Sequence, residues 1–113
     1  MAELEKGIVT IDNGTGNVFA DLGLPASETD MLKIDIAAAI TGTIQRHELT
    51  QEDAAQILGT DQAKVSSIVR GRVKGFSVGR LMTYLLMLGQ DIDIRISKKA
   101  KKSRGRIRIR DAA

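Results

Sequence analysis

The chain of 113 residues contains no cysteine, one proline and one histidine, and its uninterrupted apolar runs are short. Without cysteine there is no disulfide framework, no thiolate metal site and no cysteine nucleophile. The longest apolar runs, residues 36–40 and 84–88, are far below the roughly 20 residues that cross a bilayer. The first residues lack the positive start and apolar stretch of a secretory signal. We therefore expect a soluble cytoplasmic protein without a membrane partner.

Groups that could support catalysis are equally scarce. His47 is the only imidazole and lies beside Glu48 where a helical pattern ends, so we interpret it as a surface side chain rather than a general base. Residues 13–17 are rich in glycine but lack the Lys-Ser/Thr pair of a phosphate-binding loop, and we interpret them as a turn. No two carboxylates show the pattern of a catalytic dyad. The sequence predicts no enzyme and no cofactor or metal.

Charge is distributed unevenly along the chain. Residues 1–63 carry 3 basic and 11 acidic side chains, whereas residues 64–113 carry 14 basic and 3 acidic ones, which leaves a net charge of +3. Residues 98–110 form a basic run that is interpreted either as a solvated tail or as part of a polyanion-binding surface. A separate cluster of four cations lies in and just after a helical pattern: Lys64, Arg70, Arg72 and Lys74. Such a surface favours a polyanion as partner.

A long helix is predicted to begin near Asp30 and to end at residues 46–48. Ser27 or Thr29 is the expected cap, because a side-chain oxygen there can accept from a free backbone N–H of the first turn. The apolar side chains recur every four residues: Leu32, Ile36, Ile40 and Ile44. This spacing defines one buried stripe.

Two short helices are predicted next. The first is capped by Thr50, with Asp53 at the third helical position in a variant of the capping box, and ends at Gly59. The second is capped by Asp61 and ends at Gly71. Together they form two capped helices around a tight turn.

A fourth helix is predicted between its cap Ser77 and Gly89. After it, residues 91–96 alternate strictly, with three isoleucines on one side, which predicts a short β-strand. A single strand is not stable alone. We therefore expect it to pair with the N-terminal arm or with the same strand of a second subunit.

The predicted fold class is mainly all-α with a short C-terminal β-strand. Residues 1–29 show little helical periodicity and are expected to form an extended N-terminal arm. Residues 30–96 are the predicted folded domain, and residues 97–113 are the predicted basic C-terminal tail.

The segment 50–72 carries the functional signal. Two helices that cross around a tight turn need a small residue where they touch, which is Ala55, and a residue that tolerates a left-handed backbone, which is Gly59. The inward side chains are Leu58, Val65 and Ile68. The outward side chains of the second helix are Gln62, Ala63, Lys64, Ser66, Ser67 and Arg70. None of these is acidic and most are short and polar, as expected for a helix that faces a phosphate-lined groove.

Residues 49–71 resemble the helix-turn-helix of the Xre/Cro/phage-repressor family, because small, glycine and branched apolar positions fall in register. Residues 17–25, 70–77 and 88–92 look like the HigA-type antitoxin branch of that family. The resemblance covers about residues 17–96. It implies a four- or five-helix lambda-repressor-like core with a terminal strand, a homodimer, a double-stranded DNA operator and a RelE/ParE-like toxin as partner. Asp61 departs from the family pattern, which has Ser or Thr there, and its charge near a phosphate would lower affinity.

The resemblance also implies site residues. The base-contacting side chains would be Gln62, Ala63 and Ser67, since glutamine can pair with adenine and a small apolar group can touch a thymine methyl. The phosphate-contacting side chains would be Gln51, Lys64, Ser66, Arg70, Arg72 and Lys74.

We therefore predict a sequence-specific DNA-binding transcriptional repressor, located in the cytoplasm with the nucleoid. It is predicted to be the antitoxin of a toxin-antitoxin pair that autoregulates its operon. One alternative is a solitary Xre-family regulator without a toxin, and another is an interaction module that uses its acidic arm. A third, an RNA-binding protein that uses residues 98–110, is disfavoured because only three aromatic residues are present for base stacking.

Overall fold

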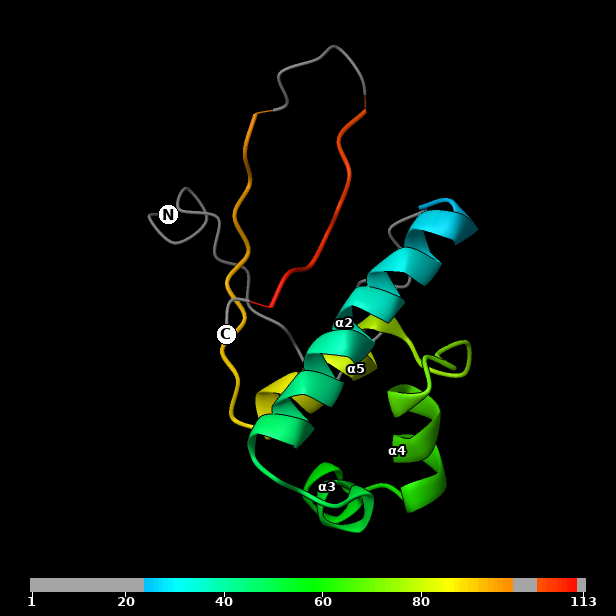
Figure 1. The fold of residues 1–113 in the computed structure, drawn as a ribbon. Helices are drawn as coiled ribbons and strands as arrows, with labels where there is room; N and C mark the ends of the chain where they lie inside the picture. The colour runs from blue at the N-terminus through cyan, green and yellow to red at the C-terminus, as the bar shows by residue number, and fades with distance from the viewer. Residues whose placement is uncertain (1–23, 99–103, 112–113) are drawn as a thin grey trace.

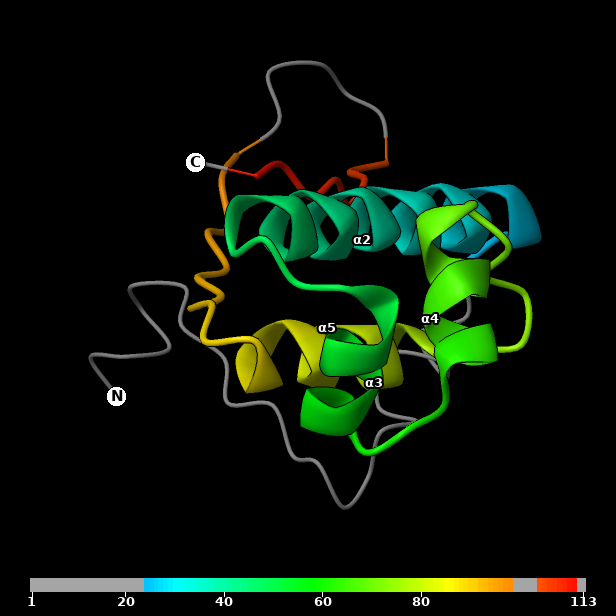
Figure 2. The same ribbon diagram turned by 60° about the horizontal axis from the view of Figure 1, so that its bottom comes forward.

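The structure is a computed structural model that describes residues 24–98 and 104–111. Within this part the chain forms four helices, α2 (Ala26–Arg46), α3 (Gln51–Leu58), α4 (Gln62–Val69) and α5 (Val78–Met87) (Figure 1). The long α2 packs against α4 and α5, while α3 packs against α4 and α5. In Figure 2, α2 and α5 lie as two layers, with α3 in front of α5 and α4 at one side. The predicted helices and the mainly all-α class are confirmed.

The first helix begins earlier than the sequence predicts. It starts at Ala26, directly after Pro25, and no side chain caps it, so the expected caps Ser27 and Thr29 are wrong. Both residues lie inside the first turn, where the negative charge of Glu28 suits the positive end of the helix dipole. The apolar stripe starts only at Leu32, so periodicity does not reveal the additional turn.

The caps of the other helices follow the sequence prediction. Thr50 Oγ1 accepts from the Asp53 N–H at 3.0 Å, and Asp53 Oδ2 accepts from the Thr50 N–H at 3.2 Å, which completes the capping box. At the start of α5, Ser77 Oγ accepts from the Arg80 N–H at 3.0 Å. These bonds satisfy backbone donors that have no partner within a helix.

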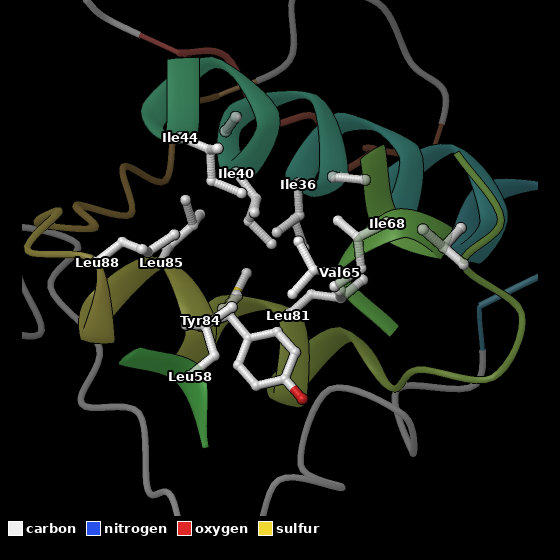
Figure 3. Packing of buried hydrophobic residues seen from close by; sticks show 14 of the residues in the cluster. Ile36, Ile40, Ile44, Leu58, Val65, Ile68, Leu81, Tyr84, Leu85 and Leu88 are labelled. Atoms are coloured by element: carbon white, nitrogen blue, oxygen red, sulfur yellow. The ribbon is translucent and has the colours of Figure 1, made fainter. Parts of the chain in front are cut away.

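The core lies where the four helices converge. Figure 3 shows Ile36 and Ile40 of α2 pointing toward Leu81 of α5, with Val65 of α4 closing one side. The sealed side chains include these four and Leu32, Ile68 and Val78. Each isoleucine or leucine that is fully buried contributes about 1.5–3 kcal/mol through removal from water. The core thus fixes α4 against the long α2, and α3 against α4 and α5.

The predicted C-terminal β-strand over residues 91–96 is wrong, because the structure has no strand among residues 24–98 and 104–111. Ile92 packs against the core and Ile94 is half-buried, whereas Ile96 is 80% exposed. A strand requires a neighbouring chain that supplies backbone hydrogen bonds. Of the three alternating isoleucines, Ile92 alone packs against the core, so the alternation here reflects neither strand pairing nor a continuous buried face.

Residues 104–111 lie along one flank of α2. Arg104 forms an ion pair with Glu28, Arg108 binds Asp35, and Asp111 Oδ2 lies 3.2 Å from Arg46 Nη1. The partners follow one another in the same order on both segments, so this part of the tail runs in the direction of α2. In both ribbon views α2 lies between residues 104–111 and α4 (Figures 1 and 2). Most of these residues are exposed, as expected for a solvated tail, but ion pairs attach them to α2.

Several sequence predictions fall outside the described residues. The N-terminal arm up to residue 23, with its turn at residues 13–17, is among them, as are residues 99–103 of the tail.

Candidate nucleic-acid interface

The turn between α3 and α4 is closed by backbone hydrogen bonds. Gly59 has φ 65° and ψ 34°, the left-handed conformation that glycine adopts without a steric penalty. The Thr60 N–H donates to the Ala55 carbonyl at 2.9 Å, which satisfies an end group of α3. Ala55 itself is only 5% exposed, in agreement with its predicted place at the helix contact. The sequence prediction of a tight turn at this point is confirmed.

The helix α4 has one buried and one open face. Val65 and Ile68 are sealed in the core. Gln62, Ala63 and Lys64 are exposed at the N-terminal end of the helix. Of the other three side chains that the sequence predicts to point outward, Ser66 and Ser67 are half-exposed and Arg70 is exposed. The flank of α4 that carries the predicted contacts is therefore accessible.

Asp61 fixes the start of α4. Its Oδ1 accepts a hydrogen bond from the Lys64 backbone N–H at 2.8 Å, as the sequence predicts for an N-cap. The residue is exposed, and the first turn of α4 contains no other acidic side chain. An aspartate thus replaces the Ser or Thr of the resembling family without loss of the cap.

Ser67 is partly engaged by its own helix. Its Oγ donates to the Ala63 carbonyl at 3.1 Å, a bond between residues one turn apart. With its hydrogen used in this way, the hydroxyl presents lone pairs rather than a donor. The sequence alone does not reveal this preference.

The four predicted phosphate-binding cations are exposed: Lys64, Arg70, Arg72 and Lys74. Within residues 24–98 and 104–111 none of them forms an ion pair. They lie on α4 and the segment that follows it. Gln51, at the first position of α3, is half-exposed next to the helix N-terminus. All four positive charges are therefore available to an external anion.

Two of the tail arginines, Arg104 and Arg108, differ from the cations near α4 because acidic residues of α2 pair with them. Asp35 accepts two hydrogen bonds from the Arg108 guanidinium, and Glu28 pairs with Arg104. Sequence analysis missed this neutralisation. Glu28 and Asp35 are seven residues apart and therefore share one face of α2, but the sequence does not show that the tail lies against this face.

The described part of the chain contains no cluster of three or more His, Asp or Glu side chains that could hold a metal ion. No helix in that part is long and apolar enough to span a membrane.

These features define a helix-turn-helix protein: two capped eight-residue helices, a left-handed glycine between them, and a second helix with an open polar flank. A family model described as "Helix-turn-helix domain" matches residues 18–97. A solved structure of an XRE family transcriptional regulator is 40% identical to this chain, with a TM-score of 0.71, and covers 78% of this chain and 100% of its own. A search of curated proteins found no match. The chain belongs to the helix-turn-helix family and is of the XRE type.

Proposed function

We propose that the chain is a sequence-specific DNA-binding transcriptional regulator that places α4 in the major groove. The observation that carries the proposal is the open flank of α4, bordered by four cations that have no ion pair within residues 24–98 and 104–111. A recognition helix needs both properties, since phosphate contacts position the protein and base contacts provide specificity. The similar XRE family regulator supports the same conclusion.

The contacts divide by position. Gln62, Ala63 and Ser67 would face base edges, with the Gln62 amide pairing with adenine and Ala63 touching a thymine methyl. The phosphate contacts would come from Gln51, Lys64, Ser66, Arg70, Arg72 and Lys74. Gln51 would bind through its side chain at the N-terminus of α3, where backbone N–H groups also favour an anion.

The test is operator selection with the full chain. Duplexes that contain a randomised segment are enriched on the protein, and the affinity for the selected sequence is then measured. Gln62→Ala with Lys64→Ala should abolish specific binding while the helical content is retained, because both side chains are exposed. The matched control is Gln45→Ala with Lys98→Ala, which removes the same residue types from exposed positions outside α4 and should bind normally. Specific binding that survives the first double variant would contradict the proposal.

We also propose a homodimer. Two adjacent apolar side chains are exposed at the end of α5, Leu86 and Met87. Adjacent exposed apolar groups favour association with a partner surface. Sedimentation equilibrium of the wild type and of Met87→Glu measures this directly, since a charge in the contact should shift the mass toward that of a single chain.

The antitoxin role is the more specific proposal. It is supported by the resemblance of residues 17–25, 70–77 and 88–92 to the HigA-type branch. The test is co-purification with the product of the adjacent reading frame, a RelE/ParE-like ribonuclease on this proposal. Removal of residues 1–24 should abolish toxin capture and leave DNA binding intact. If the full chain captures no such protein, a solitary regulator is the correct alternative.

A further inference from the structure

Asp61 is the acidic side chain at the N-terminal end of α4, beside Gln62 and Ala63. The residue is exposed, and α4 has no acidic side chain of its own. A carboxylate at this point opposes the purpose of the surrounding surface, because it repels the phosphates that the cations attract. Capping of α4 explains an oxygen at this position, but Ser or Thr would supply one without the charge, so the charge itself has no explanation in capping or phosphate binding.

The cap bond orients the carboxylate and leaves part of it unused. Oδ1 accepts from the Lys64 N–H at 2.8 Å, so the side chain is held across the end of the helix. An ionised carboxylate has about four acceptor sites and no donor. Within residues 24–98 and 104–111, the bond from the Lys64 N–H is the hydrogen bond that the Asp61 carboxylate accepts, while the backbone carbonyl of Asp61 accepts from the Val65 N–H at 3.3 Å. The remaining acceptor sites of Asp61 are open to an external donor.

The donors that a major groove offers are few. Guanine presents only acceptors there, and thymine presents an acceptor and a methyl group, whereas cytosine and adenine each carry an amino group. Adenine also has the N7 acceptor next to its amino group, which repels a carboxylate, while the cytosine edge has no acceptor of its own. Among the four bases, cytosine is the best match for Asp61.

We propose that Asp61 determines specificity by accepting a hydrogen bond from the amino group of a cytosine at the base pair that meets the N-terminus of α4. This inference rests on the proposed function, since it requires α4 to lie in the major groove. It assigns the carboxylate two tasks, capping the helix with Oδ1 and reading a base with its other oxygen. The same charge weakens binding to all other sequences through phosphate repulsion.

The decisive variant is Asp61→Asn. Asparagine is as good an N-cap as aspartate, so α4 is retained. Its amide NH₂, however, can also donate to the acceptor atoms of thymine or guanine. The wild type should select cytosine at one position of each half-site. Replacing that C·G pair by T·A should weaken wild-type binding about 30-fold, the middle of the usual range for one mismatch. For Asp61→Asn, the ratio of the affinity for the C·G site to the affinity for the T·A site should fall to about 1. The base preference at every other selected position should not change. Asp61→Ser, a shorter cap, should show the same loss.

Three results would overturn the inference. If Asp61→Asn binds all sequences more tightly by one common factor and keeps the cytosine preference, Asp61 acts only as a phosphate repellent. If the wild type selects an operator without cytosine at this position, the assignment is wrong while the proposed function stands. If the wild type selects no sequence at all, the proposed function fails, and this inference fails with it. Thermal unfolding within about 2 °C of the wild type shows that the cap is intact, since loss of a cap lowers stability by about 1 kcal/mol or more.

Discussion

The carboxylate of Asp35 receives the Arg108 guanidinium through two hydrogen bonds, Nε to Oδ2 at 2.9 Å and Nη2 to Oδ1 at 3.3 Å. The backbone N–H of Ile109 donates to the same Oδ2 at 3.3 Å. This paired geometry fixes the relative position of α2 and a segment 73 residues further along the chain. Ile109 packs against the core beside it, so the contact combines charge with burial.

Arg108→Gln is expected to release residues 104–111 from α2. The guanidinium supplies both side-chain hydrogen bonds to Asp35, and glutamine cannot reproduce the paired geometry. Hydrogen exchange of the Ile109 amide should become faster by about 10-fold or more, because the local opening energy falls. Arg106→Gln is the matched control, since Arg106 is exposed and forms no ion pair within the described residues. Equal exchange in the two variants would contradict the role of Arg108.

The contact of Asp35 with Arg108 and Ile109 is expected to depend on pH. Burial alone raises the pKa of Asp35, but the hydrogen bonds from Arg108 and the Ile109 N–H, with the charge of Arg108, outweigh burial and place the pKa below its ordinary value. A carboxylate with a lowered pKa contributes stability above its unfolded pKa of about 3.9, and this contribution is lost as the pH falls through the folded pKa.

The measurement is hydrogen exchange at Ile109, corrected for the intrinsic pH effect, between pH 6 and pH 2.5. Protection should be constant at the upper end and fall below about pH 4. Asp35→Asn cannot titrate, so its protection should be low and independent of pH in this range. A wild-type profile that matches the variant would exclude Asp35 as the group responsible.

Gly59→Ala is expected to destabilise the helix-turn-helix. The residue has φ 65°, and an added Cβ meets no atom within 4 Å, so the penalty arises from the backbone conformation alone. A left-handed conformation costs a residue with a side chain about 1–2 kcal/mol. Urea unfolding should show that the free energy of unfolding falls by this amount. Gly75→Ala, where an added Cβ also has open space and φ is not positive, should unfold within about 0.5 kcal/mol of the wild type.

DNA affinity is expected to fall steeply with salt concentration. If each subunit neutralises about four phosphates, a dimer gives a slope of about −7 in a plot of log affinity against log salt. Lys64→Gln with Arg70→Gln should make the slope shallower by about 3 to 4, because two phosphate contacts are lost from each subunit.

The control for this slope is Arg106→Gln with Arg110→Gln. Both residues belong to the segment that α2 separates from α4, so the slope should remain within about 1 of the wild type (Figure 1). A wild-type slope shallower than about −2 would show that the exposed cations near α4 serve another ligand.

Local chemistry explains why much of this fold is predictable from the sequence. The caps at Thr50, Asp61 and Ser77 each depend on an oxygen and a backbone N–H three residues later, so the sequence contains both partners. The buried stripe of α2 is likewise a matter of spacing. The openness of the α4 flank follows from the same periodicity, once Val65 and Ile68 are assigned to the core.

The errors concern features that depend on distant parts of the chain. A strand over residues 91–96 requires a hydrogen-bonding neighbour, and alternation of side chains cannot reveal whether one is present. The tail contact requires Asp35 to meet Arg108 across 73 residues. The start of α2 is missed because residues 26–29 include no large apolar side chain and therefore leave no periodic signal. The base and phosphate contacts remain predictions.

The eight residues of α4 also limit how much genetic information one copy of the protein can read. At 1.5 Å per residue the helix is about 12 Å long, which spans about four base pairs. A given sequence of four base pairs recurs once in every roughly 250 positions, whereas a genome contains about a million positions or more. A single α4 would therefore match thousands of sites in a genome. Recognition of a unique site requires a second short sequence, read at a fixed distance from the first.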